Sequence, residues 1–144
     1  MILLVEDNPN DDLLTVRALK KHGFDQGLVV ARDGAQALDY LFASGTYSGR
    51  DGLRMPRVIL LDLKLPKVGG LEVLRRVRQD ERTRHIPIVV LSSSIEERDL
   101  VASYELGANS YVRKPVDFDA FHRAARQLSC YWLMLNEAPP TPGA

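Results

Sequence analysis

Short, continuous apolar runs alternate with segments of helical periodicity along most of this chain. The runs have the length of strands and comprise residues 2–5, 28–31, 58–61 and 86–91, and a fifth strand is expected over residues 110–112. A strand that is apolar at every position suits a parallel sheet, because helices then cover both of its faces. The alternation therefore predicts an α/β fold with a doubly wound, five-stranded parallel sheet and five helices.

Cap and turn residues mark where several of the predicted helices begin and end. Asn8 before Pro9 is typical of an N-cap followed by the first helical residue. Asp11 and Asp12 fit the first turn, where the helix dipole favours acids, so we assign both to helix stabilisation and not to a site. A fourth helix is expected over residues 95–106, with Ser94 as its cap, and the last helix over residues 117–135.

Length and composition indicate a single globular domain. The chain has 144 residues, of which we assign 1–137 to the domain and 138–144, with three prolines and a glycine, to a disordered tail. Lys plus Arg and Asp plus Glu both number 19, so nothing favours nucleic-acid binding through a basic surface. Cys130 is the only cysteine, which excludes an internal disulfide, and no apolar run is long enough for a membrane span. A reducing, cytoplasmic location is the resulting expectation.

Polar side chains follow four of the apolar runs: Glu6 and Asp7 the first, Asp62 the third, Ser92 the fourth and Lys114 the fifth. In open parallel sheets, ligands bind outside the carboxyl ends of the strands, so these side chains should share one edge of the core. Clustered carboxylates need a cation, and an all-oxygen site suits Mg²⁺, which also binds phosphate oxygens. Lysine and serine add a positive charge and a hydroxyl donor for a phosphoryl group carried by Asp62.

Four ordered segments, LLVEDN, ILLDLKLP, IVVLSSS and YVRKP, resemble the response-regulator receiver family of two-component signalling. The resemblance covers residues 1 to about 135. It implies a flavodoxin-like sheet of order 2-1-3-4-5 and an Asp62 that accepts a phosphoryl group from a sensor histidine kinase. It also implies that Asp7 binds Mg²⁺ directly, that Glu6 acts through water, and that Asp62 and the carbonyl of Lys64 complete the metal site. Such a protein is not an enzyme, apart from catalysing its own phosphorylation and dephosphorylation.

The same resemblance assigns the residues that respond to phosphorylation. Ser92 is the switch hydroxyl, and Tyr111 is the switch aromatic residue. Lys114 pairs with Asp62 or its phosphate, and the Lys114–Pro115 peptide bond is expected to be cis.

A closer resemblance is to single-domain regulators paired with bacterial phytochrome histidine kinases. It depends on the long loop at residues 44–56, the LDLKLPK run and the ending LSCYWLMLNEAPP. It implies a phytochrome as the kinase and protein–protein contact as the output. Two positions depart from the receiver pattern: Glu6 is longer than the more usual Asp, and Lys64 is a bulky cation where smaller or neutral residues are common. The Lys64 side chain is a candidate shield for the acyl phosphate against water.

The last predicted helix carries more apolar residues than one contact with the core requires. The positions expected to face the core are Phe118, Phe121, Ala125, Leu128, Trp132 and Leu135. The opposite side of the helical wheel holds Cys130, Leu133 and Met134. We expect that side to be exposed and to form a homodimer, together with the fifth-strand region. Docking of the proline-rich tail over it is the alternative.

Taken singly, each site residue has an ordinary structural interpretation as a turn acid, helix cap, surface lysine or packed tyrosine; only the joint pattern favours the receiver. Two other functions stay open. One is a receiver-like module that binds partners without phosphate. The other is a phosphohydrolase with Asp62 as nucleophile, which would need an acid where Lys64 stands. A DNA-binding regulator is less favoured still, because too little chain follows the last helix for a helix-turn-helix.

Overall fold

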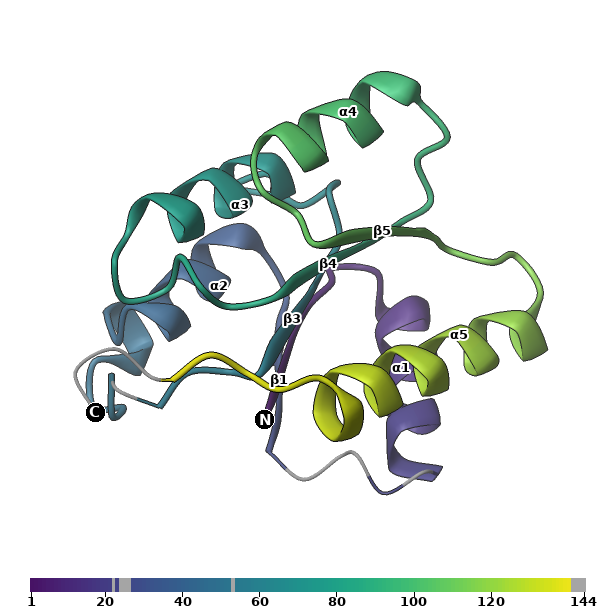
Figure 1. Cartoon of the computed structure of the whole chain (residues 1–144), viewed down its shortest axis with the longest axis horizontal. Helices are drawn as coiled ribbons and strands as arrows, with labels where there is room; N and C mark the ends of the chain where they lie inside the picture. Colours follow the sequence, from purple (N-terminus) through teal and green to yellow (C-terminus); the bar gives the residue numbers. More distant parts are fainter. Residues whose placement is uncertain (22, 24–26, 53, 141–144) are drawn as a thin grey trace.

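The computed structural model describes residues 1–21, 23, 27–52 and 54–140 and shows strands alternating with helices (Figure 1). The strands are β1 (Ile2–Val5), β2 (Leu28–Ala31), β3 (Val58–Leu61), β4 (Ile88–Ser92) and β5 (Ser110–Arg113). The helices are α1 (Pro9–Lys21), α2 (Gly34–Leu41), α3 (Gly70–Gln79), α4 (Glu97–Glu105) and α5 (Phe118–Cys130). All neighbouring strands are parallel and their order is β2-β1-β3-β4-β5, which confirms the predicted doubly wound sheet.

Two hydrophobic cores lie on opposite faces of the sheet, because successive strand residues point to opposite sides. Leu3 and Ile59 belong to the core that packs against α2 and α3. Leu4 and Leu60 belong to the core that packs against α1 and α5. Figure 1 shows α1 and α5 side by side on one face and α2, α3 and α4 on the other. Burial on both faces explains why the central strands β1 and β3 are apolar at every position.

The start of α4 differs from the prediction. Its N-cap is Glu96, which makes no side-chain cap bond, so Ser94 is not the helix cap. Instead, the Ser94 hydroxyl accepts a hydrogen bond from the Glu96 N–H at 3.2 Å and donates one to the Asp99 carboxylate at 2.5 Å. Ser94, which precedes the helix, therefore links the segment between β4 and α4 to the first turn of α4.

The last helix changes its hydrogen-bonding pattern after Cys130. A π-helical segment, Tyr131–Leu135, continues α5, and the Asn136 N–H donates to the Tyr131 carbonyl at 2.7 Å. A π turn takes in more residues than an α turn. Side chains in this segment are therefore rotated away from the positions that an α-helical wheel predicts.

This rotation corrects part of the predicted core face. Leu133, expected on the outer side, packs against the core, whereas Leu135, expected on the inner side, is 74% exposed. Phe118 was also predicted wrongly: it is exposed in the first turn of α5, where its ring lies 6.1 Å from that of His122. The inward positions that the structure confirms are Phe121, Ala125, Leu128 and Trp132.

The end of the described chain turns back toward the sheet. Ala138 and Pro139 line a cavity of about 80 Å³ together with Pro56, Arg57 and Pro87, among others. Residues 141–144 lie outside the described residues, so the disordered tail stays a prediction. Within the described part of the chain, no helix has the length and apolar character needed to cross a bilayer.

Candidate functional site

The acids that follow β1 and β3 come together because these two strands are neighbours in register. Val5 pairs with Leu61, so the chain leaves both strands at the same level of the sheet. Carboxylate oxygens of Glu6, Asp7 and Asp62 all lie within 4.8 Å of one another. Glu6 and Asp62 are buried and Asp7 is exposed. The cluster has the composition and the edge position that the strand ends predicted.

Lys114 reaches this cluster from the end of β5. Its backbone N–H donates to the Ser92 carbonyl at 2.8 Å, which continues the pairing of β5 with β4. Its Nζ donates to the carboxylate of Glu6, to Asp11 at 2.9 Å and to Asp62 at 3.0 Å. An ammonium group has three N–H donors, so these carboxylates engage all of them. The lysine side chain is only 6% exposed, which makes the ion pairs stronger than those of a surface lysine.

Asp11 is the member of the site that sequence reasoning missed. Its place in the first turn of α1 was attributed to the helix dipole alone. The available signal was its spacing: the first turn of α1 follows Asp7 directly, at the edge where the strand ends meet. An acid in that turn can therefore point back at the side chains that gather at the strand ends.

The electrostatics of the cluster reflect an excess of acids over bases. Burial, together with the adjacent Asp62 carboxyl, raises the pKa of Glu6 to about 8. Burial by itself would lower the pKa of Lys114, but its bonds to Glu6 and Asp11 and the charge of Asp62 outweigh burial and raise it above its ordinary value. Within the described chain, Glu6 Oε2 is buried without a hydrogen-bond partner. The excess of negative charge at the site therefore favours the binding of a further cation.

Ser92 and Tyr111 are joined through Ser94. Ser92 is fully buried, and its hydroxyl oxygen accepts a hydrogen bond from the Ser94 N–H at 3.2 Å. Tyr111 is half-buried and its hydroxyl donates to the Ser94 carbonyl at 3.3 Å. A change at the Ser92 hydroxyl can therefore reach the Tyr111 ring through a single intervening residue.

The loop between β3 and α3 folds tightly over Asp62. The Lys64 N–H donates to Asp62 Oδ1 at 3.4 Å, and the Lys64 side chain is exposed. Gly70 closes the loop by donating to the Leu63 carbonyl at 2.9 Å. A Cβ on Gly70 would lie 2.3 Å from the Asp62 carbonyl oxygen and 2.6 Å from the Leu63 Cα. Only glycine lets α3 begin this close to the end of β3.

The Lys114–Pro115 peptide bond does not have the expected geometry. No described residue is preceded by a cis peptide bond, so this bond is trans. Trans is the more stable isomer for X–Pro by about 0.5–1 kcal/mol, and the position of Lys114 in the site is reached with it.

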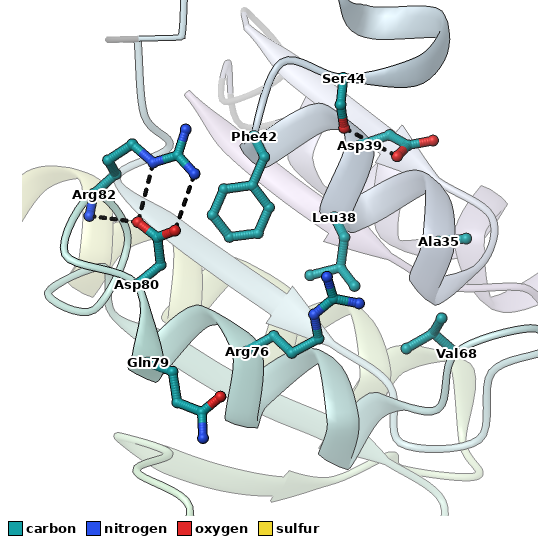
Figure 2. A pocket seen from close by; sticks show the side chains of 10 residues that line it. All are labelled: Ala35, Leu38, Asp39, Phe42, Ser44, Val68, Arg76, Gln79, Asp80 and Arg82. Atoms are coloured by element: carbon teal, nitrogen blue, oxygen red, sulfur yellow. Dashed lines mark hydrogen bonds and ion pairs between the residues drawn. The ribbon is translucent and has the colours of Figure 1, made fainter.

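A cavity lined by residues of α2 and α3 lies away from this cluster (Figure 2). It measures about 490 Å³ and lies between α2 and α3, with Leu38, Phe42 and Arg76 in its walls. Arg82 lies over the Phe42 ring at 4.8 Å from its centre and is hydrogen-bonded to Asp80. None of the acids at the strand ends lines this cavity, so its size does not mark the chemical site.

Comparison with known proteins decides between the possible families. The model of the response regulator receiver domain matches residues 2–126. The chain belongs to this family. It is also 43% identical over 139 residues to the probable methanogenesis regulatory protein FilR2 of Methanothrix harundinacea, covering 96% of this chain and 87% of that one. The response regulator Rcp1 of Synechocystis is 38% identical over 133 residues, covering 92% and 88% of the two chains.

Solved structures of related receivers have the same fold. The Mn(2+)-bound form of Rcp1 has a TM-score of 0.88 at 37% identity and covers 96% of this receiver and 98% of that chain. The phosphorylated cyanobacterial phytochrome response regulator RcpA has a TM-score of 0.89 at 37% identity, with coverage of 96% and 97%. The bacteriophytochrome response regulator AtBRR is 57% identical with a TM-score of 0.73, covering 94% and 96%.

Proposed function

We propose that this receiver acts as a single-domain response regulator that accepts a phosphoryl group on Asp62 from a sensor histidine kinase. The observation that carries the proposal is the meeting of Asp62 with Lys114, 3.0 Å away, and with Glu6 and Asp7 at the carboxyl end of the sheet. A carboxylate so placed can attack phosphorus while the lysine balances the charge of the phosphoryl oxygens.

The residues present fit a divalent cation, and we propose Mg²⁺. Glu6, Asp7, Asp62 and the carbonyl of Lys64 would hold it, and all of their ligand atoms are oxygens, which suits this ion. The buried, unpartnered Oε2 of Glu6 is the structural reason to expect a ligand there. When bound, the cation supplies positive charge for the phosphoryl oxygens during transfer. Support from a relative is the Mn(2+)-bound form of Rcp1, named above.

In the transfer step, a carboxylate oxygen of Asp62 forms a bond to phosphorus as the P–N bond of a phosphohistidine breaks. The electron pair of that bond stays on the imidazole nitrogen, and Asp62 becomes an acyl phosphate. Lys114 then turns its N–H groups toward the phosphoryl oxygens, and the Ser92 hydroxyl donates to one of them. If the Ser92 side chain rotates to make this contact, its oxygen moves away from the Ser94 N–H, from which it now accepts a hydrogen bond.

The readout would begin at that exchange. When Ser92 turns to the phosphoryl group, the Ser94 N–H loses its hydrogen bond to the Ser92 hydroxyl. The carbonyl of Ser94 is the group to which the Tyr111 hydroxyl donates. A shift of the segment before α4, together with Tyr111, would change the surface that α4 and β5 present to partners.

We also propose a phytochrome as the kinase and a homodimer as the assembled form. Two of the similar structures are named as phytochrome response regulators, and AtBRR is 57% identical to this receiver. For the dimer, the support is the π-helical segment, where Met134 is 70% and Leu135 74% exposed next to an exposed Tyr131. Exposed apolar side chains that gather in one segment are candidates for a protein-binding surface.

The test of the function is intact-protein mass spectrometry after incubation with acetyl phosphate and Mg²⁺. Wild type should gain a single phosphoryl group, and the adduct should disappear with EDTA and in Asp62→Asn. Asp119→Asn is the matched control, because it removes an exposed acid from the first turn of α5. Absence of the adduct on wild type, where another receiver labels in parallel, would favour a module that binds partners without phosphate.

A further inference from the structure

Asp11 is held in a fixed position that points it at Lys114. Its N–H donates to the Asn8 side chain at 3.3 Å, and its carbonyl accepts from the buried Thr15 hydroxyl at 2.9 Å. Its carboxylate lies in the first turn of α1, where the helix dipole stabilises a negative charge. The side chain is 27% exposed, so the contact with Lys114 Nζ is partly shielded from water.

Asp11 stands apart from the acids that are placed to hold a cation. The described acids whose oxygens lie within 4.8 Å of one another are Glu6, Asp7 and Asp62, and Asp11 is not one of them. Its contact in the site is the ammonium group of Lys114, at 2.9 Å. A role in the site must therefore act through the lysine.

The three donors of Lys114 leave none for a new partner. They bind Glu6, Asp11 and Asp62, and the backbone N–H of Lys114 is fixed to Ser92, so only the side chain can reorient. Phosphorylation converts Asp62 into an acyl phosphate and adds oxygens that need the ammonium charge. Asp11 stays a carboxylate and continues to compete for that charge.

We propose that Asp11 is a positioning residue that retains Lys114 in the unphosphorylated arrangement and thereby weakens its engagement of the phosphoryl group. This inference rests on the proposed function of Asp62. Asp11 opposes the phosphorylated state because it accepts one N–H of Lys114, which the phosphoryl oxygens would otherwise engage. The strength of the switch is then set by an acid outside the metal-binding cluster.

The experiment measures the affinity of the full chain for beryllium trifluoride, a non-covalent mimic of the phosphoryl group, at saturating Mg²⁺. Binding is followed by ¹⁹F NMR and titration calorimetry. Asp11→Asn keeps the shape and removes the charge, and it should bind the mimic roughly three- to tenfold more tightly, as expected for one charge-assisted hydrogen bond. Asp11→Glu restores the charge and should return the affinity toward wild type. Asp119→Asn loses an acid from the equivalent turn of α5 and should leave the affinity unchanged.

A double-mutant cycle tests whether the effect passes through the lysine. In a Lys114→Ala background, Asp11→Asn should no longer tighten binding. An undiminished effect there, or an unchanged or weaker affinity of Asp11→Asn in the wild-type background, would overturn the inference. If wild type and Asp119→Asn both fail to bind the mimic, the proposed function of Asp62 fails instead, so the two failures are distinguishable.

Discussion

The carboxyl ends of the strands and the C-terminal helical segment are built on opposite principles. At the strand ends, the carboxylates of Glu6, Asp11 and Asp62 converge on the buried ammonium group of Lys114. The positions of Glu6, Asp62 and Lys114 follow from the pairing of the strands that they end. In the C-terminal segment, apolar side chains project away from the core at Tyr131, Met134 and Leu135.

The difference indicates which region contributes to the stability of the domain and which is available to bind partners. A buried polar cluster is destabilising unless its members satisfy one another, so a change at one member should be felt in the folding of the whole domain. Exposed apolar side chains contribute little to folding, but they gain free energy when a partner covers them. Substitutions at the first region should change stability, whereas those at the second should change association.

The largest effect is expected from Lys114→Met. Without the ammonium group, the buried carboxyl groups of Glu6 and Asp62 lose their charged hydrogen-bond donor, which should lower the free energy of unfolding by about 3 kcal/mol in metal-free buffer. Urea denaturation measures the loss, and added Mg²⁺ should restore part of it, because a bound cation stabilises the folded state. Lys64→Met, an exposed lysine two residues after Asp62, should change stability by less than about 0.5 kcal/mol. Equal losses for the two lysines would contradict the role of the buried network.

A smaller effect is expected from Gly70→Ala. Its Cβ would lie 2.3 Å from a backbone oxygen of Asp62, so the loop must move, at a cost of about 1–3 kcal/mol, and phosphorylation should slow. The neighbouring Gly69 is the matched control, since it has φ −69° and nothing within 4 Å of an added Cβ. Thermal unfolding should show Gly69→Ala close to wild type. If both variants behave alike, the close approach of α3 to Asp62 is not what positions the loop.

Leu135→Ser tests the C-terminal segment. Because the side chain is 74% exposed, its replacement should change the unfolding free energy by less than about 0.5 kcal/mol. The dissociation constant of the proposed dimer should rise about tenfold, as for one apolar contact at an interface centre. Light scattering over a concentration series measures the association. Lys20→Ser, on an exposed part of α1, is the control, and an unchanged dimer in Leu135→Ser would move the interface elsewhere.

The smallest effect is expected from Tyr111→Phe. This change removes a single hydrogen bond to the Ser94 carbonyl and keeps the ring, so stability should fall by about 1 kcal/mol or less. The sharper readout is the link between Ser92 and Tyr111: NMR shifts at Ser94 on phosphorylation should persist, while those at the ring of residue 111 should shrink. Identical shift patterns in the two proteins would mean that the hydroxyl does not carry the coupling.

The sequence by itself determined the elements of this fold and most of the site. Fully apolar runs required a sheet covered on both faces, and residues that end such runs must lie at its rim, which is how Glu6, Asp7, Asp62 and Lys114 could be named in advance. These inferences needed only local patterns, because in a parallel sheet the strand direction already determines the edge at which each strand ends.

The tertiary structure decided the contacts that no local pattern contains. Asp11 looked like an ordinary helix-start acid, and only the position of β5 beside β4 brings Lys114 from 103 positions away to its carboxylate. The π turn after Cys130 was likewise not visible in the α-helical periodicity, and with it Leu133 packs against the core whereas Leu135 is exposed, the reverse of the expected facing. The physical reason is the same in both cases: periodicity predicts which face of an element is apolar. Which groups then meet is set by packing between elements that are distant in the chain.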